Sequence, residues 1–330
     1  MMRPAAVRLG LIGVGRWGKV YIRTVLSLGA RCRLTQLGTS KPAHAALVPY
    51  PVQVTSDWRK AIDSDCDAVL IATPPSTHAQ IVEACLEAGK PCMVEKPLCL
   101  DLASAERVHQ RIQASGVPVL VNHTQLFNPG YQALKRAVDD AGETIRVLIA
   151  EGMALGVFRT HTPTLWDWCP HDFNLCLDLM GQSPVRVAAL GGPADPNGAP
   201  ELVSVRLDFA GGSCAWIHAG RLSPHKRRTL SVFTDTQLFM FDDLATERLT
   251  VSRMDFARRY ANGIPEPLEK RALALASTRR PMEHALTYFL DGLAGGDRRY
   301  FGSDLALEVV RLLEQCESAM KKEEEAVSKR

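Results

Sequence analysis

The sequence predicts two domains: an N-terminal α/β domain built on a doubly wound parallel sheet, and a C-terminal α+β domain with a large, mostly antiparallel open sheet. The first observation is that apolar, strand-like runs alternate with helical segments up to about residue 122. The second is that strand-like segments then follow one another with little helix between them. The third is the length of 330 residues, which favours two domains over one. We therefore expect residues 1–123 and 124–330 to form separate domains.

In the N-terminal part, each predicted strand is a short apolar run bounded by turn residues. The run AVLIA is apolar throughout, as expected for a parallel strand covered on both faces. The predicted strands are 7–12, 33–38, 68–72, 91–95 and 117–121, and the predicted helices are 19–28, 77–88 and 101–115.

In the C-terminal part, strands dominate and helices are few. The pair Gly211-Gly212 indicates a tight hairpin between two of the strands. The predicted strands are 145–155, 185–190, 202–209, 213–218, 229–234 and 237–241, and the predicted helices are about 167–180, 281–294 and 303–320.

Composition narrows the class of protein. Hydrophobic residues make up 46% and charged residues 23%, as in an ordinary globular enzyme. The net charge of +3 is too weak to indicate a nucleic-acid partner. No apolar run approaches the roughly 18–20 residues of a membrane span. The nine cysteines show no spacing for zinc, so we expect no metal site, reduced thiols and a cytoplasmic location.

The first predicted strand runs into the turn Gly13-Val14-Gly15-Arg16-Trp17-Gly18, which matches GxGxxG. The pattern alone is weak, but here it follows an apolar strand and opens a helix. Gly13 would permit the sharp turn, Gly15 would let a pyrophosphate approach, and Gly18 would let helix and strand pack. Amides at the helix start, around Arg16 and Trp17, would hold the phosphate charge. The turn predicts a Rossmann dinucleotide site; the alternative is a glycine-rich turn without a ligand.

The second predicted strand bears on the type of dinucleotide. An acidic residue at its end would bind the adenosine ribose of NAD(H), but the sequence there is Gly38-Thr39-Ser40-Lys41. An acid would repel a 2′-phosphate, whereas the hydroxyls of Thr39 and Ser40 and the amine of Lys41 would accept one. We therefore expect NADP(H) slightly in preference to NAD(H). The alternative is a plain surface turn that holds the ribose loosely.

Three later loops fall at the same carboxyl edge of the predicted sheet, where ligands of such sheets bind. One contains Thr73, Pro74 and His78; the next contains Glu95 and Lys96; and the last contains Asn122 and His123. A charge directly after a buried strand is unusual, so Lys96 indicates a functional role, against the alternative of a lysine snorkelling at the domain rim. His78 would either contact the cofactor or cap its helix.

Taken in order, GVGRWG, ATPPSTH, EKP and the Asp167–His171 segment resemble the Gfo/Idh/MocA oxidoreductases, the family of glucose–fructose oxidoreductase and inositol dehydrogenase. The resemblance spans nearly the whole chain. It implies a Rossmann domain, an NAD(P) cofactor, and a C-terminal sheet that joins copies into a homodimer or homotetramer. Within the family, LWDWCPHD and SPHKRR…FDD look most like the branch that oxidises nucleotide-linked sugars.

Asp167 and His171 are four residues apart, so a helix places them on one face. Because Pro170 is tolerated only in a first turn, we expect the pair at a helix N-terminus. His171 would be the general base in alcohol oxidation and the acid in the reverse direction. Asp167 would orient it, and Lys96 would hydrogen-bond the reacting oxygen. The alternative for His171 is a cap or core residue.

The substrate is expected to be a small polyol, sugar or nucleotide-sugar, contacted by the residues Lys96, Asn122, His123, Arg159, Asp167 and His171. The basic run at 225–228 would hold a diphosphate or carboxylate, or form a solvated edge. Two other functions stay open. One is a cofactor-binding regulator without turnover, and the other is an enzyme acting on an inositol or another cyclic carbonyl compound.

Overall fold

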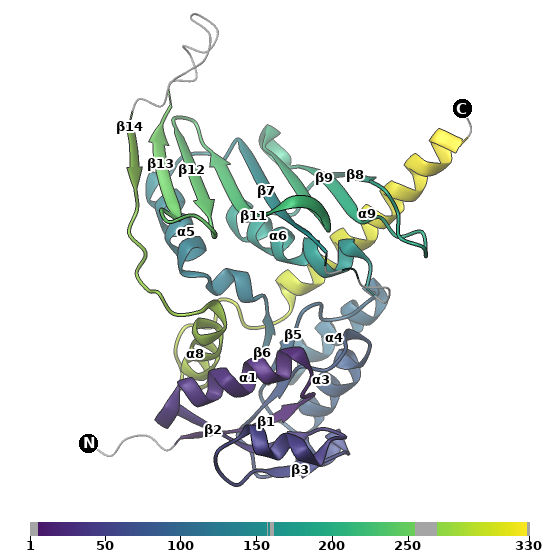
Figure 1. The fold of residues 1–330 in the computed structure, drawn as a ribbon, viewed down its shortest axis with the longest axis vertical. Helices are drawn as coiled ribbons and strands as arrows, with labels where there is room; N and C mark the ends of the chain where they lie inside the picture. Colours follow the sequence, from purple (N-terminus) through teal and green to yellow (C-terminus); the bar gives the residue numbers. More distant parts are fainter. Residues whose placement is uncertain (1–5, 157, 159–161, 255–268, 329–330) are drawn as a thin grey trace, which may run out of the picture. The chain divides into compact units, whose positions relative to one another are not determined.

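The computed structural model describes residues 6–156, 158, 162–254 and 269–328 (Figure 1). Two compact units account for the fold. The first comprises residues 1–124 and 279–310, and the second comprises residues 125–278 and 311–330. No helix in the described ranges is both long enough and apolar enough to cross a membrane.

The first unit is built on a six-stranded parallel sheet with the order β3-β2-β1-β4-β5-β6. Its strands are β1 (Val7–Ile12), β2 (Cys32–Gly38), β3 (Gln53–Thr55), β4 (Ala68–Ile71), β5 (Cys92–Glu95) and β6 (Val119–Asn122). The inner strands are apolar because helices cover both faces of the sheet. The chain order reverses between β1 and β4, which is the switch point where sheets of this kind bind ligands.

Helices accompany these strands along the chain, and two of them begin with an aspartate side-chain cap. The helices of the first unit are α1 (Arg16–Ser27), α2 (Trp58–Asp63), α3 (His78–Glu87), α4 (Leu102–Ser115) and α8 (Pro281–Leu293). For example, the Asp101 carboxylate caps α4 by accepting a hydrogen bond from the Ser104 amide at 2.7 Å. The alternation of strand and helix predicted from the sequence is thereby confirmed.

The second unit is built on an eight-stranded, mostly antiparallel sheet with the order β14-β13-β12-β11-β7-β10-β9-β8. Its strands are β7 (Val147–Leu155), β8 (Arg186–Gly191), β9 (Leu202–Asp208), β10 (Cys214–Gly220), β11 (Leu222–Phe233), β12 (Gln237–Asp242), β13 (Leu249–Arg253) and β14 (Glu269–Ala272). Helices α5 (Pro129–Ala141) and α6 (Thr164–Met180) pack on one face (Figure 1). Helix α9 (Asp304–Ser328) begins in the first unit and ends in the second.

The other face of this sheet is less well covered. Strand register places Arg206, Trp216, Ile149, Ser231 and Met240 in one row across five neighbouring strands. Trp216 is 38% exposed and Met240 46% exposed. The row therefore leaves large apolar side chains on an open sheet surface.

The structure differs from the sequence prediction in how the chain is divided. The first break falls after Thr124, one residue from the predicted boundary, but residues 279–310 return to the first unit. Helix α8 packs on α1, where Ser27 donates a hydrogen bond to Glu283 at 2.8 Å. A bridge between Leu120 and Gly302 extends the parallel sheet. Such long-range pairings leave no local signal in the sequence. The sequence prediction also missed five elements, namely β3, α2, α5, β13 and β14.

Candidate functional site

The three glycines of the first turn are needed for different reasons. Gly13 has a φ of +89°, and a Cβ there would lie 2.7 Å from the Ala72 carbonyl. A Cβ on Gly18 would lie 2.0 Å from the Gly13 oxygen, so the first turn of α1 packs on β1 only with glycine. Gly15 has an ordinary φ of −77°, and nothing lies within 4 Å of the place a Cβ would take. The protein's own fold therefore does not require Gly15, and the open space beside it suits a bound group.

The start of α1 offers hydrogen-bond donors at the same place. Gly15 is the N-cap residue and provides no side-chain cap, and the first turn contains no acidic residue. The first backbone N–H groups of a helix have no partner within the helix and favour anions. This arrangement suits the pyrophosphate of a dinucleotide.

A cavity of about 510 Å³ opens beside the glycine turn within the first unit. It is lined by Ile12, Gly13, Val14, Gly15, Arg16, Lys19, Gly38, Thr39, Ser40, Lys41, His44, Ser56, Trp58, Thr73, Pro74, Thr77 and Ile81. Eight predicted cofactor contacts are therefore brought together: Gly13, Gly15, Arg16, Thr39, Ser40, Lys41, Thr73 and Pro74. Its lining residues include three cations and neither aspartate nor glutamate. The sequence reading missed Lys19 and His44.

His78 does not line this cavity, and the structure gives it another role. The side chain is fully buried at the start of α3. Its Nδ1 lies 2.8 Å from the Pro97 oxygen and its Nε2 lies 2.9 Å from the Thr73 oxygen. Burial lowers the pKa of this imidazole, and the two carbonyls partly oppose the effect. His78 thus joins the loop after β4 to the loop after β5, rather than capping its helix with its side chain.

A buried carboxylate lies at the end of β5, directly before Lys96. Glu95 Oε1 accepts hydrogen bonds from the Tyr21 hydroxyl at 2.9 Å and from the Asn122 amide nitrogen at 2.7 Å. The same amide nitrogen also donates to the Tyr21 oxygen at 2.9 Å. Burial raises the pKa of Glu95, and hydrogen bonds from Asn122 and Tyr21 offset part of that rise. Glu95 and Asn122, predicted as ligand contacts, are therefore occupied with joining β5, β6 and α1.

Lys96 and His123 lie beside this buried group. The Lys96–Pro97 peptide bond is cis. His123 is almost fully buried, and burial, together with the positive charge of Lys96, lowers its pKa to about 3. The imidazole is consequently neutral near pH 7. The amine of Lys96 thus follows a buried carboxylate and lies close enough to His123 to disfavour protonation of its imidazole.

In the second unit, helix α6 carries Asp167 and His171. The helix is continuous from Thr164 to Met180, so the two side chains lie one turn apart on one face. The predicted start near residue 167 is wrong by three residues, and Pro170 lies inside the helix rather than in its first turn. Asp167 remains in the first turn, but His171 lies in the second.

Contacts from outside the helix explain why it begins early. The Thr164 hydroxyl donates to Glu201 Oε2 at 2.9 Å, and the Trp166 indole donates to Glu317 Oε1 at 2.7 Å. These anchors hold the first turn although Pro170 cannot donate a backbone hydrogen bond to the preceding turn. The side chain of Trp166 is itself buried.

Arg221, which the sequence reading missed, is buried beside this first turn. It follows β10 and is among the largest fully buried side chains of the described residues. Its guanidinium donates to Asp167 Oδ2 at 3.2 Å, to Glu201 Oε2 at 3.3 Å and to the Thr162 carbonyl at 2.9 Å. The signal in the sequence was a charge directly after an apolar strand, the same signal that indicated Lys96.

Half of the basic run at 225–228 is engaged in ion pairs within the second unit. Arg227 donates to Glu151 Oε1 at 2.8 Å, and Arg228 donates to the buried Asp172 at 3.2 Å. His225 and Lys226 lie in the irregular part of β11, between Leu222 and Arg227, and are exposed. The two arginines therefore serve the sheet and α6, which leaves at most two residues of the run for a substrate anion.

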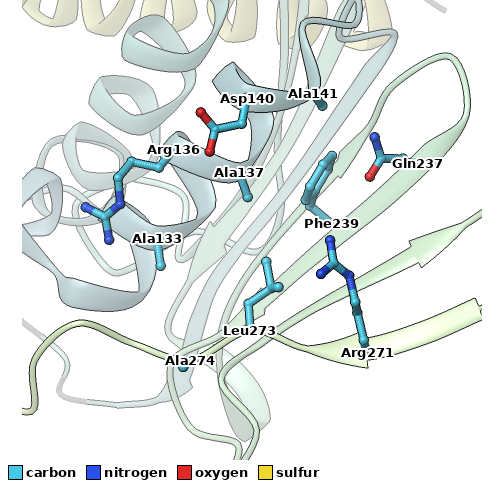
Figure 2. Close-up of a pocket in the computed structure, with 10 residues that line it drawn as sticks. All are labelled: Ala133, Arg136, Ala137, Asp140, Ala141, Gln237, Phe239, Arg271, Leu273 and Ala274. Carbon is cyan, nitrogen blue, oxygen red and sulfur yellow. The ribbon is translucent and has the colours of Figure 1, made fainter.

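The second unit also holds a cavity of about 440 Å³ between α5 and the β12–β14 edge of the sheet (Figure 2). Figure 2 shows Arg271 reaching from β14 toward Phe239, while Arg136 and Asp140 project from α5. None of the predicted site residues lines it.

Other predicted contacts lie away from the first-unit cavity or outside the described residues. Trp17 is exposed on α1, and Gly18 is packed beneath the glycine turn. Arg159 falls outside the described residues. Within the described parts of the chain, no group of histidine, cysteine and acidic side chains could hold a metal ion.

Comparison with known families agrees with this reading of both units. Residues 7–123 match the family described as "Oxidoreductase family, NAD-binding Rossmann fold" of the GFO_IDH_MocA type. Residues 160–238 match the GFO/IDH/MocA C-terminal domain. The two matches cover the glycine turn, the β4 and β5 loops, α6 and Arg221.

Individual relatives extend the match over most of the chain. Inositol 2-dehydrogenase of Rhizobium meliloti is 31% identical over 235 residues, covering 65% of this chain and 69% of that protein. UDP-N-acetylglucosamine 3-dehydrogenase of Acidithiobacillus ferrooxidans is 28% identical over 229 residues, covering 69% and 71%. A crystal structure of a candidate oxidoreductase from Magnetospirillum magnetotacticum has 37% identity and a TM-score of 0.84, covering 94% of this chain and 100% of that one. The chain therefore belongs to the Gfo/Idh/MocA oxidoreductase family, as its motifs predicted.

Proposed function

We propose that this chain is a nicotinamide-dependent dehydrogenase that oxidises a CH–OH carbon of a sugar or nucleotide-linked sugar. The observation that carries the proposal is the first-unit cavity, beside which Gly15 leaves space that the fold does not require. The names of the two relatives support the reaction type, since both are dehydrogenases, one of inositol and one of a UDP-linked sugar.

The chemistry divides between the cofactor and the side chains. A bound nicotinamide ring supplies the hydride acceptor. As the C–H bond of the alcohol breaks, its hydroxyl must also lose a proton, and we assign that proton to His171. Lys96 hydrogen-bonds the same oxygen and steadies the negative charge that develops there. Asp167 orients His171, and in the reverse direction His171 returns the proton.

The cavity lining supports NADP(H) in slight preference to NAD(H). Arg16, Lys19 and Lys41 contribute positive charge, and no lining carboxylate would repel a 2′-phosphate. The test is a pair of dissociation constants, for NADPH and NADH, in the natural protein and in Arg16→Ala/Lys41→Ala. The proposal expects the double variant to weaken NADPH binding about tenfold or more and NADH binding much less. Equal losses for both nucleotides would contradict the preference.

Turnover is tested by absorbance at the reduced-nicotinamide band. Sugars, inositols and UDP-linked sugars are each offered with NADP⁺ or NAD⁺, using the natural protein, Lys96→Ala and His171→Ala. A substrate should be turned over by the natural protein, and removing the general base should lower kcat by about 10² to 10⁴. Undiminished turnover in both variants would refute these roles. Tight binding without turnover on any substrate would favour the regulator instead.

We also propose that the open face of the eight-stranded sheet joins copies of this chain into a homodimer or homotetramer. The exposed row containing Trp216 and Met240 supports this, because a bare apolar sheet surface is a liability for a monomer. Trp216→Glu should shift the assembly toward monomer, as measured by light scattering. A natural protein that is monomeric at micromolar concentration would overturn this proposal.

A further inference from the structure

We propose that Arg221 is a positioning residue: its buried guanidinium fixes Asp167 at the first turn of α6 so that Asp167 can orient His171. This inference rests on the proposed function, because it concerns the residues assigned there to proton transfer.

The position of Arg221 is set by several contacts that do not involve Asp167. Its backbone N–H donates to the Glu201 carbonyl at 2.8 Å, and its own carbonyl accepts from the Gly156 amide at 3.0 Å. Its side chain donates to Glu201 Oε2 and to the Thr162 carbonyl. The backbone of Arg221 is therefore held next to the end of β7 and the start of β9, and its guanidinium is held by Glu201 and by the chain just before α6.

The three charged groups are exposed to different degrees. The side chain of Arg221 is 1% exposed, that of Glu201 9% and that of Asp167 18%. Glu201 alone would balance the guanidinium charge. The second carboxylate, on Asp167, is the most accessible member of the cluster. The buried Arg221 therefore binds Asp167 on one side and leaves the rest of its carboxylate partly exposed. A group that orients a neighbouring side chain needs this combination of a fixed position and access.

This contact also restricts what Asp167 can offer to His171. Arg221 binds Oδ2, and helix α6 places Asp167 one turn before His171 on the same face. The negative charge of the Asp167 carboxylate consequently has a fixed position, one helical turn before His171. Loss of the guanidinium would remove the hydrogen bond that holds Oδ2 of Asp167, and a small displacement of a group at the reacting centre can reduce the rate strongly.

Helix α6 contains a matched control. Arg228 pairs with Asp172 at 3.2 Å, the same distance as in the Arg221–Asp167 pair. Asp172 is almost fully buried and lies beside Gly152 of β7. A Cβ added at Gly152 would lie 2.6 Å from Oδ2 of Asp172. Both pairs hold α6 in the second unit, but only the Arg221 pair includes a residue that we assign to the orientation of His171.

The experiment compares Arg221→Gln, Arg221→Lys, Arg228→Gln, Asp167→Asn and the double variant Arg221→Gln/Asp167→Asn. Each is assayed for kcat, for dinucleotide affinity and for thermal unfolding. We expect Arg221→Gln to lower kcat about ten- to a hundredfold while dinucleotide affinity stays within about threefold. Arg221→Lys should recover part of kcat, and Arg228→Gln should reduce stability with kcat within about threefold.

The double variant separates positioning from a general structural role. If Arg221 acts through Asp167, adding Arg221→Gln to Asp167→Asn should lower kcat by no more than about threefold further. The inference would be overturned if the double variant lost kcat by the product of the two single losses. It would also be overturned if Arg221→Gln and Arg228→Gln lowered kcat equally. If Arg221→Gln does not fold, the same cycle is run in Glu201→Gln, where less buried charge is left unbalanced. Full activity in Asp167→Asn would instead refute the proposed function of Asp167, and the two failures are therefore distinguishable.

Discussion

The end of β5 and the first turn of α6 each bury a charged side chain beside a residue proposed to act on the substrate, but they balance that charge differently. At β5, the Glu95 carboxylate precedes Lys96 and receives hydrogen bonds from two neutral groups, the Tyr21 hydroxyl and the Asn122 amide. At α6, the Arg221 guanidinium is shared between two carboxylates.

This difference predicts which substitutions each cluster tolerates. A carboxylate held by neutral donors can lose its charge and keep its hydrogen bonds, because a glutamine of the same shape still accepts them. A guanidinium between two acids cannot be removed without leaving buried negative charge unbalanced. The α6 cluster should therefore be the more sensitive of the two to substitution.

The largest expected effect is on the stability of Arg221→Met. Removing the guanidinium takes away the buried cation that Glu201 and Asp167 share, which should lower the free energy of unfolding by about 3–5 kcal/mol. Urea denaturation measures it. Arg146→Met is the control, because Arg146 forms an exposed pair with Asp235 and should matter little. Similar losses in the free energy of unfolding for the two variants would refute the claim that the α6 cluster depends on its buried cation.

A smaller effect is expected at Glu95, and it should depend on the replacement. Glu95→Leu removes the acceptor of the Tyr21 hydroxyl, whereas the Asn122 amide nitrogen can still donate to the Tyr21 oxygen. The substitution should therefore cost about 1–3 kcal/mol, the cost of one unpaired buried donor. Glu95→Gln keeps an acceptor oxygen and should cost much less. Urea denaturation near pH 7 distinguishes the two substitutions. Equal destabilisation would show that the charge of Glu95, rather than its hydrogen bonds, holds β5, β6 and α1 together.

The smallest effect is a dependence of stability on pH. Burial raises the pKa of Glu95 above its ordinary value of 4.5, so the folded state binds this proton more tightly than the unfolded chain. The stability of the natural protein relative to Glu95→Gln should therefore decline as pH rises from about 4.5 through the raised pKa.

Glu143 should show the opposite sign. Partial burial opposes ionisation there, but hydrogen bonds from Thr234, Thr236 and Gln237 outweigh it and lower the pKa to about 2. Its contribution to stability should be complete above pH 4.5 and lost as pH falls toward 2. The test compares the free energy of unfolding of the natural protein with that of Glu143→Gln across pH 2–7. If the difference from the natural protein changed with pH in the same direction for Glu143→Gln and Glu95→Gln, the opposite pKa shifts of the two residues would be contradicted.

The two clusters are alike in what the sequence could not predict, because each depends on a partner that is remote in the chain. The glycine turn and the loops after β4 and β5 are local patterns, and the structure has them at the predicted ends of their strands. The Asp167–His171 spacing correctly predicted one helix face for the pair, but His171 lies in the second turn rather than in the first. Arg221 was missed because its partner Asp167 lies 54 positions away in the sequence. Tyr21, which holds Glu95, was missed for the same reason, being 74 positions distant.

Local rules also misled in one place. A proline inside a helix is costly, so Pro170 predicted a late start for α6. The anchors at Thr164 and Trp166 outweigh that cost, and they come from segments remote in sequence. The return of residues 279–310 to the first unit depends on contacts of the same kind, such as the one between Ser27 and Glu283.

The central claim is that a dinucleotide occupies the first-unit cavity beside Gly15, and one pair of variants tests it directly. Gly15→Ala places a methyl group where the structure leaves open space, whereas Gly18→Ala places one 2.0 Å from the Gly13 oxygen. The account predicts that Gly15→Ala changes Tm by no more than about 2 °C yet weakens NADPH binding at least about tenfold. Gly18→Ala should lower Tm markedly. NADPH affinity in Gly15→Ala equal to that of the natural protein would contradict the account.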